Sequence, residues 1–503
     1  MHSIDDTEAR DPGFASFWGH PRPVWMLFGV TIGLNFAFYG FRAYLAPYIE
    51  HFFVAMGPAA AQKQADLVSS GFLALMYATP IIGGYVADKI LGETRALIMA
   101  LWLGVIGLVL MALPSLIGFE IGMALFALSA GLGIPLTVLI GRTYGPGDPR
   151  RAGGYTIFYL AINLGAFITP FICADWIGKN YGYHWGFIAA AVGMLVAALI
   201  FQAYHRILRP ALPRGDHLHG RMATVWVLAV IAVLLYPTAL LLSFPKILSW
   251  SMYGLMILLV LYFVVSCVRR GDRVQAQRYI ALFLLFVPYV VFWAFSLQGV
   301  TSLNFLARDH VTPIWHGVLP MLHLSWSYTL FQSANPLFIL IFAPLMAMLW
   351  PWLDRKGRDP STPRKFGIGL LLVALGYGVL VLAIHYLQGP NGHISWWPLA
   401  LCYLLATLGE LALSPIGYSL VGQLAAPEEA SLAMGGWFFG VALAYQLGGW
   451  IATLTTSGAG ASALPTVAGY GHVYALLFWW GLAVAAVFLL AAPWIKRLMH
   501  GIR

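Results

Sequence analysis

The chain has 503 residues, of which 60% are hydrophobic and only 9% are charged. Soluble globular domains carry about 25% charged residues, so this composition excludes a water-soluble protein of this length. Hydrophobic blocks of roughly 20 residues, each long enough to cross a bilayer, recur along the whole sequence. We therefore predict an all-α membrane protein that lies in the lipid bilayer.

Fourteen membrane spans are predicted in chain order, each placed to within a few residues by hydrophobicity and flanking polar residues. The expected spans are 24–47, 66–87, 95–113, 118–140, 154–176, 184–204, 221–243, 248–268, 279–301, 328–351, 366–387, 395–421, 431–455 and 470–494.

The positive charges indicate the orientation of these spans. An even number of spans places both termini on the same side of the membrane. Nearly all of the 28 Lys and Arg residues lie on that side; Lys63, Lys179, Lys246 and Arg308 lie on the other side and Arg42 lies within a span. Lys and Arg are enriched in cytoplasmic loops, so we predict cytoplasmic termini. The net charge of +9 is thus a sign of topology, and no nucleic-acid partner is expected.

The polar first 20 residues do not resemble a cleavable signal peptide and are expected to form a cytoplasmic tail. Three cysteines, Cys173, Cys267 and Cys402, all fall within predicted spans. Their wide separation predicts packing roles, with no disulfide framework, metal site or cofactor.

Polar loops divide the chain into five predicted parts. The loop "HRILRPALPRGDHLHGR" ends a first set of six spans, and the last six spans form a second set. The predicted parts are an N-terminal tail 1–22, a six-helix bundle 23–205, a transmembrane hairpin with linkers 206–278, a six-helix bundle 279–495 and a tail 496–503. The hairpin has few polar residues, so we expect it to face lipid.

The segment "GGYVADKILGETR", residues 83–95, follows the second span into a cytoplasmic loop. It resembles the loop motif Gly-x-x-x-Asp-Arg/Lys-x-x-Gly of the major facilitator superfamily. The resemblance implies a cytoplasmic latch made by Asp88, Lys89 and Arg95, with glycines that let helices approach closely. An ordinary loop with charges that set topology is the alternative.

Six further segments narrow the family. "FYLAINLGAF" in the fifth span, together with "GPGDPRRAGG" in the loop just before it, resembles the signature of the proton-coupled oligopeptide transporters, and "FYGFRAYL", "LFQSANPLF", "LGELALSPIGYS" and "MGGWFFG" agree with that family in the right order. The family's bacterial members also carry a two-helix insert between their six-helix halves. The resemblance implies a major facilitator fold with two six-helix bundles and an inserted hairpin.

The chain departs from the family pattern at charged positions. The family's first helix reads Glu-x-x-Glu-Arg-Phe-x-Tyr-Tyr-Gly-x-Arg, a lysine is usual in the fourth span, and a glutamate is usual in the seventh of the family's core spans. The corresponding residues here are Thr31, Leu34, Asn35, Ile134 and Leu297. Because the acids and bases are lost together, we interpret the substrate pocket as changed in a coordinated way, so that either the proton coupling or the cargo differs from that of the family.

Arg42 and Glu410 are the only ionisable residues that we place deep within the predicted spans. Each costs roughly 3 kcal/mol or more at mid-membrane, so each needs a function or a partner. The resemblance implies that Arg42 meets a peptide carboxylate, whose two oxygens match the guanidinium fork, and that Glu410 meets the amino group. A structural bridge between the two residues is the alternative.

The resemblance also implies a polar and aromatic lining around this pair. Asn35 and Tyr39 share one helical face with Arg42. The remaining candidates are Tyr77, Asn163, Trp293, Gln298, Asn335, Trp437 and Phe438. Asp309, His310 and His323, near the outer face, are expected to be solvated loop residues.

We predict a secondary transporter working by alternating access in a bacterial inner membrane, with di- or tripeptides or peptide-like zwitterions as substrate. Proton coupling is expected to be absent, or to depend on Glu410 alone. A transporter of a modified peptide, a peptide-like metabolite or a non-peptide anion is the alternative, and a membrane sensor is a remote one. The spans contain no catalytic triad, metal cluster or phosphate loop, so no enzyme is expected.

Overall fold

The structure is a computed structural model that describes residues 12–145, 147–212, 220–312, 327–457 and 465–502. In this part of the chain, 14 helical segments are long and apolar enough to cross a membrane. They are Arg22–Arg42, Pro58–Leu91, Glu93–Met111, Leu116–Arg142, Arg151–Tyr181, Tyr183–Ala211, Arg221–Ser243, Pro245–Arg270, Arg273–His310, Tyr328–Arg355, Thr362–Tyr386, Trp396–Leu413, Leu432–Thr456 and Val467–Leu498. The predicted all-α membrane architecture and its spans are confirmed.

The described residues belong to two compact units. The first unit contains Met1–Phe41 and Ala78–Leu240, and the second contains Arg42–Tyr77 and Leu241–Arg503. The two units are defined only by which residues contact one another. The predicted division into two six-helix bundles and a hairpin concerns the parts that move during transport, and it stays a prediction.

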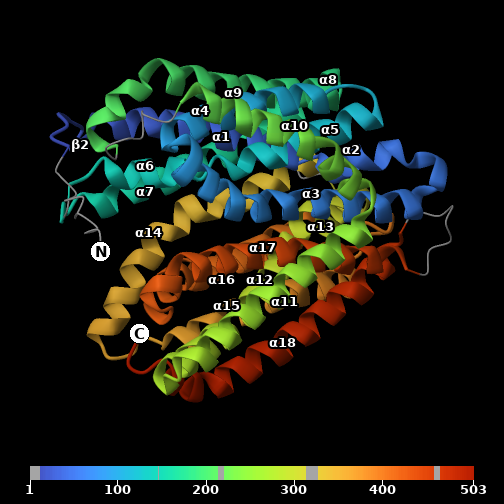
Figure 1. The fold of residues 1–503 in the computed structure, drawn as a ribbon. Coiled ribbons are helices and arrows are strands. Elements are labelled where there is room, and N and C mark those ends of the chain that lie inside the picture. Colours follow the sequence, from blue (N-terminus) through green and yellow to red (C-terminus); the bar gives the residue numbers. More distant parts are fainter. Residues whose placement is uncertain (1–11, 146, 213–219, 313–326, 458–464, 503) are drawn as a thin grey trace. The chain divides into compact units, whose positions relative to one another are not determined.

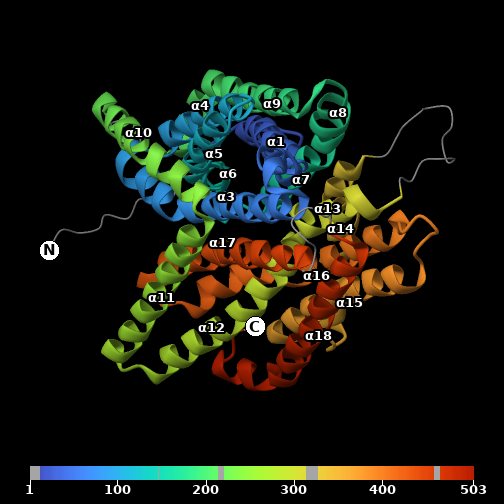
Figure 2. The same cartoon turned by 90° about the vertical axis from the view of Figure 1, so that its right-hand side faces the viewer.

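In the first unit, α4, α5 and α9 run side by side (Figures 1 and 2). Its elements are β1 (Ser16–Phe17), β2 (His20–Pro21), α1 (Arg22–Arg42), α4 (Glu93–Met111), α5 (Leu116–Gly131), α6 (Pro135–Arg142), α7 (Arg151–Thr169), α8 (Lys179–Tyr181), α9 (Tyr183–Tyr204) and α10 (Arg221–Ser243). The two strands pair antiparallel. Two π-helical segments, Ala87–Leu91 and Pro170–Gly178, and a 3₁₀ segment, His205–Ala211, extend these helices.

In the second unit, α15 packs between α16 and α18, and α12 packs on α17. Its helices are α2 (Leu45–Phe52), α3 (Pro58–Val86, whose last residues from Ala78 belong to the first unit), α11 (Pro245–Arg270), α12 (Arg273–Ser296), α13 (Ser302–His310), α14 (Ala334–Arg355), α15 (Thr362–Tyr386), α16 (Trp396–Leu424), α17 (Ala430–Thr453) and α18 (Val467–Leu498). Short 3₁₀ turns join them at Val54–Met56, Leu297–Val300, Tyr328–Ser333, Pro427–Glu429 and Leu454–Thr456.

Local sequence explains where several helices end. Gly271 adopts a left-handed conformation with φ 66° at the end of α11, which suits a residue without a Cβ atom. Asp272 then caps α12, and its side chain accepts hydrogen bonds from the backbone N–H groups of Val274 and Gln275. The short turn "RRGDR" therefore both ends one span and begins the next.

Two spans are interrupted. The fourth breaks after Gly131 and resumes at Pro135, whose missing N–H is tolerated at a helix start. The ninth breaks at Thr301, which has φ −117° and ψ −104° and separates the Leu297–Val300 turn from α13. Such breaks expose backbone groups that other parts of the protein must satisfy.

The two helices of the predicted hairpin pack on different units. In α10, Val227 and Ile231 join an apolar cluster of the first unit that includes Ala87 and Leu91, whereas α11 contacts α12 and α17 of the second unit. Their other faces carry exposed apolar side chains, as expected for contact with lipid, among them Trp226 (66% exposed) and Trp250 (74% exposed).

Candidate substrate site

Arg42 is the last residue of α1, and its side chain is only partly exposed. A cation is favoured at the C-terminal end of a helix, where the unpaired carbonyl groups carry partial negative charge. The chain turns at once into α2, and Asn304 Nδ2 of α13 donates a 3.0 Å hydrogen bond to the Ala43 carbonyl oxygen. This contact fixes the backbone next to Arg42 in the second unit.

Glu410 lies in the middle of α16 and is held by α14. Asn335 Nδ2 donates hydrogen bonds to Glu410 Oε2 at 2.9 Å and to Thr407 Oγ1 at 3.0 Å. Thr407 is fully buried, and its hydroxyl donates to the Tyr403 carbonyl oxygen one turn earlier. Asn335 therefore positions the carboxylate, and the structure places two of the predicted site residues in direct contact.

Arg42 lies close enough to Glu410 and Tyr403 for its charge to act on both groups. Because residues 42–77 pack with the C-terminal helices, the two charges belong to the same compact unit. The predicted bundles 23–205 and 279–495 hold Arg42 and Glu410 separately, whereas the grouping by contacts places both residues in the second unit.

Gln298 is fully buried and engaged within the protein. Its Nε2 donates to the carbonyl oxygens of Ala294, at 3.1 Å, and Gly448, at 2.9 Å, and its Oε1 accepts from Ser302 Oγ at 2.7 Å. These bonds satisfy polar groups at the break between α12 and α13 and attach that turn to α17. We infer that Gln298 supports the site by holding this turn.

The aromatic candidates differ in their surroundings. Trp437 is 2% exposed and stacks on Tyr289 with ring centroids 4.3 Å apart, so it packs in the core. Tyr289 also meets the edge of Trp293, which is partly exposed, and Phe438 is 38% exposed. Trp293 and Phe438 are thus more exposed than Trp437, and ligand contact stays a prediction for all three rings.

Tyr77 contributes a further ring from α3. Its centroid lies 5.5 Å from that of Tyr445 in α17. Both residues belong to the second unit, which therefore holds Arg42, Tyr77, Trp293, Gln298, Asn335, Glu410, Trp437 and Phe438 of the predicted set.

The other three candidates belong to the first unit. The Nδ2 groups of Asn35 and Asn163 each donate to a carbonyl oxygen one turn earlier in their own helix, at 2.8 and 2.9 Å. Helices α1 and α7 cross closely here, since a Cβ atom added at Gly165 would lie 3.2 Å from Asn35 Cβ. Tyr39 is partly exposed and packs against the Phe38 ring.

The predicted latch motif contains an ion pair that sequence reasoning missed. Asp88 and Lys89 are exposed in the π-helical segment, and Arg95 lies in the first turn of α4. Glu93, only 4% exposed, accepts hydrogen bonds from Arg142 Nε at 2.9 Å and Nη2 at 2.6 Å. The motif ends in "GETR", and this ion pair between the buried Glu93 and the partly exposed Arg142 joins α4 to α6. The gating role of the three predicted residues remains a prediction.

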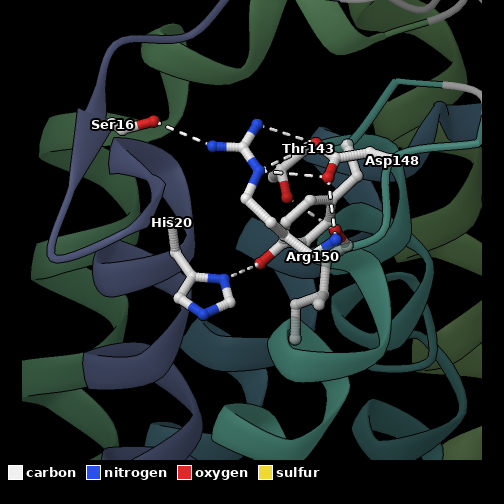
Figure 3. A network of polar contacts seen from close by, with 7 residues as sticks. Ser16, His20, Thr143, Asp148 and Arg150 are labelled. Carbon is white, nitrogen blue, oxygen red and sulfur yellow. Dashed lines mark hydrogen bonds and ion pairs between the residues drawn. The ribbon is translucent and has the colours of Figure 1, made fainter.

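The loop "GPGDPRRAGG" also holds the N-terminal strands. Figure 3 shows Arg150 donating from Nη1 to Ser16 Oγ at 2.9 Å and from Nη2 to Asp148 Oδ2 at 2.7 Å. His20, which the same figure labels, is also engaged in a polar contact. Its Nδ1 lies 2.8 Å from the Tyr144 hydroxyl. The Arg150 hydrogen bonds hold the pKa of the Asp148 carboxyl below its usual value, and burial raises the pKa of Tyr144 to about 12.

Comparison with known proteins identifies the family. The family model described as the POT family matches residues 94–468. The chain belongs to the POT family.

Relatives within this family extend along nearly the whole chain. The peptide transporter YePEPT of Yersinia enterocolitica is 34% identical over 86% of this chain and 87% of its own length. The uncharacterized transporter YclF of Bacillus subtilis is 32% identical over 100% of both chains. The dipeptide and tripeptide permease B of Salmonella typhimurium is 30% identical over 95% of this chain and 96% of its own.

Solved structures of POT-family proteins share the fold. A variant of a peptide transporter POT in complex with alafosfalin matches with a TM-score of 0.82, 31% identity and 98% coverage of both chains. A POT family transporter in complex with 5-aminolevulinic acid matches with a TM-score of 0.78 and 27% identity, covering 95% of this chain and 98% of its own. The predicted major facilitator fold is confirmed by this likeness.

One ionisable residue of this POT-family chain was missed. Asp66 lies in α3, is 0% exposed and is as deeply enclosed as any residue of the site. Asp66 is therefore a further buried ionisable residue within a span, beside the predicted Arg42 and Glu410. The predicted span began at residue 66, whereas the helix begins at Pro58, so the sequence pattern placed Asp66 at a membrane surface.

Proposed function

We propose that this protein is a secondary transporter that moves di- or tripeptides, or zwitterions built like them, across a bacterial inner membrane by alternating access. Membership of the POT family and relatives named as peptide transporters support this proposal. The single observation that carries the substrate class is that the charge of Arg42 acts on Glu410, whose carboxylate is positioned by Asn335. Both termini are cytoplasmic in this proposal, and the protein is not an enzyme.

Opposite charges at the two ends of a peptide match this arrangement. The planar guanidinium of Arg42 presents a fork of donors that fits both oxygens of a terminal carboxylate. The carboxylate of Glu410 accepts hydrogen bonds from a terminal ammonium group. Each side chain is more costly to bury alone than in the presence of its ligand partner, so binding a zwitterion offsets part of the cost of both.

Proton coupling is absent or altered in this proposal. The acids and bases that the family carries in the first, fourth and seventh core spans are Thr31, Leu34, Asn35, Ile134 and Leu297 here. None of these side chains can take up or release a proton. Coupling therefore requires Glu410 or another buried acid.

A second candidate cargo is a zwitterion without a peptide bond. The structural relative solved with 5-aminolevulinic acid shows that a POT-family protein binds a compound with an amino group and a carboxylate at its ends. The same Arg42 and Glu410 pair would suit such a compound, whereas a ligand with only one charged end would leave one side chain unmatched.

Uptake of a radiolabelled dipeptide into proteoliposomes tests the proposal. We expect wild-type protein to take up the dipeptide, and Arg42→Ala to bind it about tenfold to a hundredfold more weakly, because a charge-assisted hydrogen bond contributes about 1.5–3 kcal/mol. Arg42→Lys keeps the charge but loses the fork and is expected to fall between them. Wild-type uptake that is absent, or unchanged by Arg42→Ala, would contradict the proposal.

A further inference from the structure

Asp66 is a fully buried carboxyl group without a hydrogen-bond partner in the described part of the chain. Its exposed fraction is 0%, and both Oδ1 and Oδ2 lack a donor within hydrogen-bonding distance. It lies in the part of α3 that packs in the second unit. A Cβ atom added at Gly449 of α17 would lie 3.3 Å from the Asp66 carbonyl oxygen, so the helices pack closely here.

Charged and titratable groups face Asp66 from three other helices. Glu50 of α2 and Arg308 of α13 both act on it electrostatically, and Tyr470 of α18 is influenced by its charge. The Tyr470 hydroxyl accepts a 2.9 Å hydrogen bond from Gln62 Nε2, one turn before Asp66 in α3. Asp66 therefore lies within a polar cluster, although none of these groups donates a hydrogen bond to it.

Arg308, the cation that acts on Asp66 among the described residues, is engaged by two other carboxylates. Arg308 donates from Nη1 and Nη2 to Glu50, and from Nε to Asp309 Oδ1 at 2.7 Å and from Nη2 to Asp309 Oδ2 at 3.0 Å. The expectation that Asp309 is a solvated loop residue is wrong, because it lies in α13 and pairs with Arg308. His323, for which the same was expected, lies outside the described residues. With both acids ionised, the cluster already carries one more negative than positive charge.

These contacts require Asp66 to be neutral in this conformation. Burying an ionised carboxylate without a hydrogen bond or ion pair costs so much that such groups take up a proton instead. An ionised Asp66 would also add a second uncompensated negative charge next to Glu50. The neutral acid avoids both costs. Asp66 ionises only when water reaches its carboxyl group, or when Arg308 releases Glu50 and pairs with Asp66 instead.

We propose that Asp66 is a proton-binding residue of this transporter, loaded in the conformation described here and discharged when the Arg308–Glu50 contact opens. The step is a plain dissociation: the carboxylic acid loses its proton to water, and Arg308 compensates the resulting carboxylate. This inference rests on the proposed transport function and adds the group through which a proton is coupled to it. It also explains how coupling survives without the acids that the family carries in its first and seventh core spans.

The test compares two kinds of dipeptide transport in proteoliposomes containing the full chain. Counterflow needs no proton gradient and reports on binding and conformational exchange, whereas accumulation under an inward proton gradient reports on coupling. We expect Asp66→Asn to retain counterflow and to lose gradient-driven accumulation. Asp175→Asn is the matched control, because Asp175 also has a buried carboxylate oxygen without a hydrogen-bond partner in the described residues but lies in the other unit; it should accumulate dipeptide as the wild type does.

Gradient-driven accumulation by Asp66→Asn at the wild-type level would overturn the proposal. Wild-type counterflow without any response to the gradient would also overturn it, while leaving the proposed transport function intact. Asp66→Glu, which restores a carboxyl group, is expected to regain gradient dependence; if it folds and does not, the proposal fails.

Infrared spectroscopy of the purified protein gives a readout that does not depend on transport. A protonated carboxyl group absorbs as a carbonyl, so the difference between wild type and Asp66→Asn should contain a carboxylic-acid band at neutral pH. The presence of this band supports a proton on Asp66 even if no dipeptide is transported, in which case only the proposed function fails. The absence of the band contradicts the inference.

Discussion

Polar side chains buried in this protein fall into two groups at the residue scale. Gln298 uses its amide for three hydrogen bonds inside the protein. The Asp66 carboxyl, in contrast, accepts none from the described residues. The first pattern is typical of a structural residue, because each buried polar group is satisfied. The second is costly for folding and is typical of a residue kept for function.

Replacing Gln298 by alanine should therefore damage the fold more than the binding of substrate. The substitution leaves Ser302 Oγ and the Gly448 carbonyl without their partner, and each unsatisfied group costs about 1–3 kcal/mol. We expect a lower thermal unfolding midpoint in detergent and a dipeptide affinity within a fewfold of wild type in the folded fraction. Unchanged stability together with a loss of binding would instead assign Gln298 to direct contact with the ligand.

The sequence indicated individual residues only where their chemistry was unusual for their position. Arg42 and Glu410 were found because charges are rare within spans. The partners of Gln298 were not, since the Gly448 carbonyl is 150 residues away along the chain. Asp66 was missed because hydropathy places the edge of a span only to within a few residues, and this helix extends to Pro58.

At the scale of helices, close crossings rely on particular glycines and not on glycine content. A Cβ atom added at Gly83 would lie 2.1 Å from the Gly131 carbonyl oxygen of α5, whereas one at its neighbour Gly84 would meet nothing within 4 Å. The pair "GG" in the sequence does not distinguish the two positions. Only the crossing of the helices does.

Alanine substitutions at these neighbours should have opposite outcomes. Gly83→Ala must push the end of α3 away from α5, because the obstructing atom is backbone and cannot rotate aside. We expect a marked loss of thermal stability for Gly83→Ala, of the 1–3 kcal/mol typical of overpacking, and almost none for Gly84→Ala. Equal melting temperatures for the two variants would show that the crossing is not as close as described.

Glu429, in the turn Pro427–Glu429 before α17, contacts two other helices of the second unit. It accepts hydrogen bonds from Ser266 of α11 and from the Tyr279 hydroxyl of α12, and it lies 3.6 Å from Arg270 Nη2. Burial opposes its ionisation, but these hydrogen bonds outweigh burial and hold the pKa of the carboxyl below its usual value. The ionised form therefore stabilises the folded protein.

The pH dependence of stability should reflect this residue. A carboxyl whose pKa is lowered on folding contributes stability above its unfolded pKa of about 4.3, and that contribution is lost as the pH falls through the lower folded value. We expect Glu429→Gln to unfold about 1–3 kcal/mol more easily at neutral pH and to lose less stability on acidification than wild type. Glu428→Gln is the matched control, because the Glu428 side chain is 70% exposed and such pairs contribute little.

At the scale of the whole molecule, the number and order of the spans followed from hydrophobicity alone, since every stretch that crosses a bilayer must be long and apolar. The seventh span was predicted at its observed bounds, Arg221–Ser243. Which spans pack against each other was harder to predict from the sequence, because one apolar helix surface resembles another in composition. That α10 packs with the first unit and α11 with the second depends on tertiary contacts such as that between Ser249 and Gln446.

The central claim is that Arg42 and Glu410 bind opposite ends of one small molecule. It is tested most directly by measuring the affinity of purified wild type, Arg42→Ala and Glu410→Gln for a dipeptide, its C-terminal amide and its N-acetyl derivative. We predict that amidation weakens binding to wild type and Glu410→Gln but not to Arg42→Ala, and that acetylation weakens binding to wild type and Arg42→Ala but not to Glu410→Gln. If each variant remains as sensitive as wild type to the loss of the charge that its missing side chain should bind, the two residues do not hold the ends of the substrate, and the account is wrong.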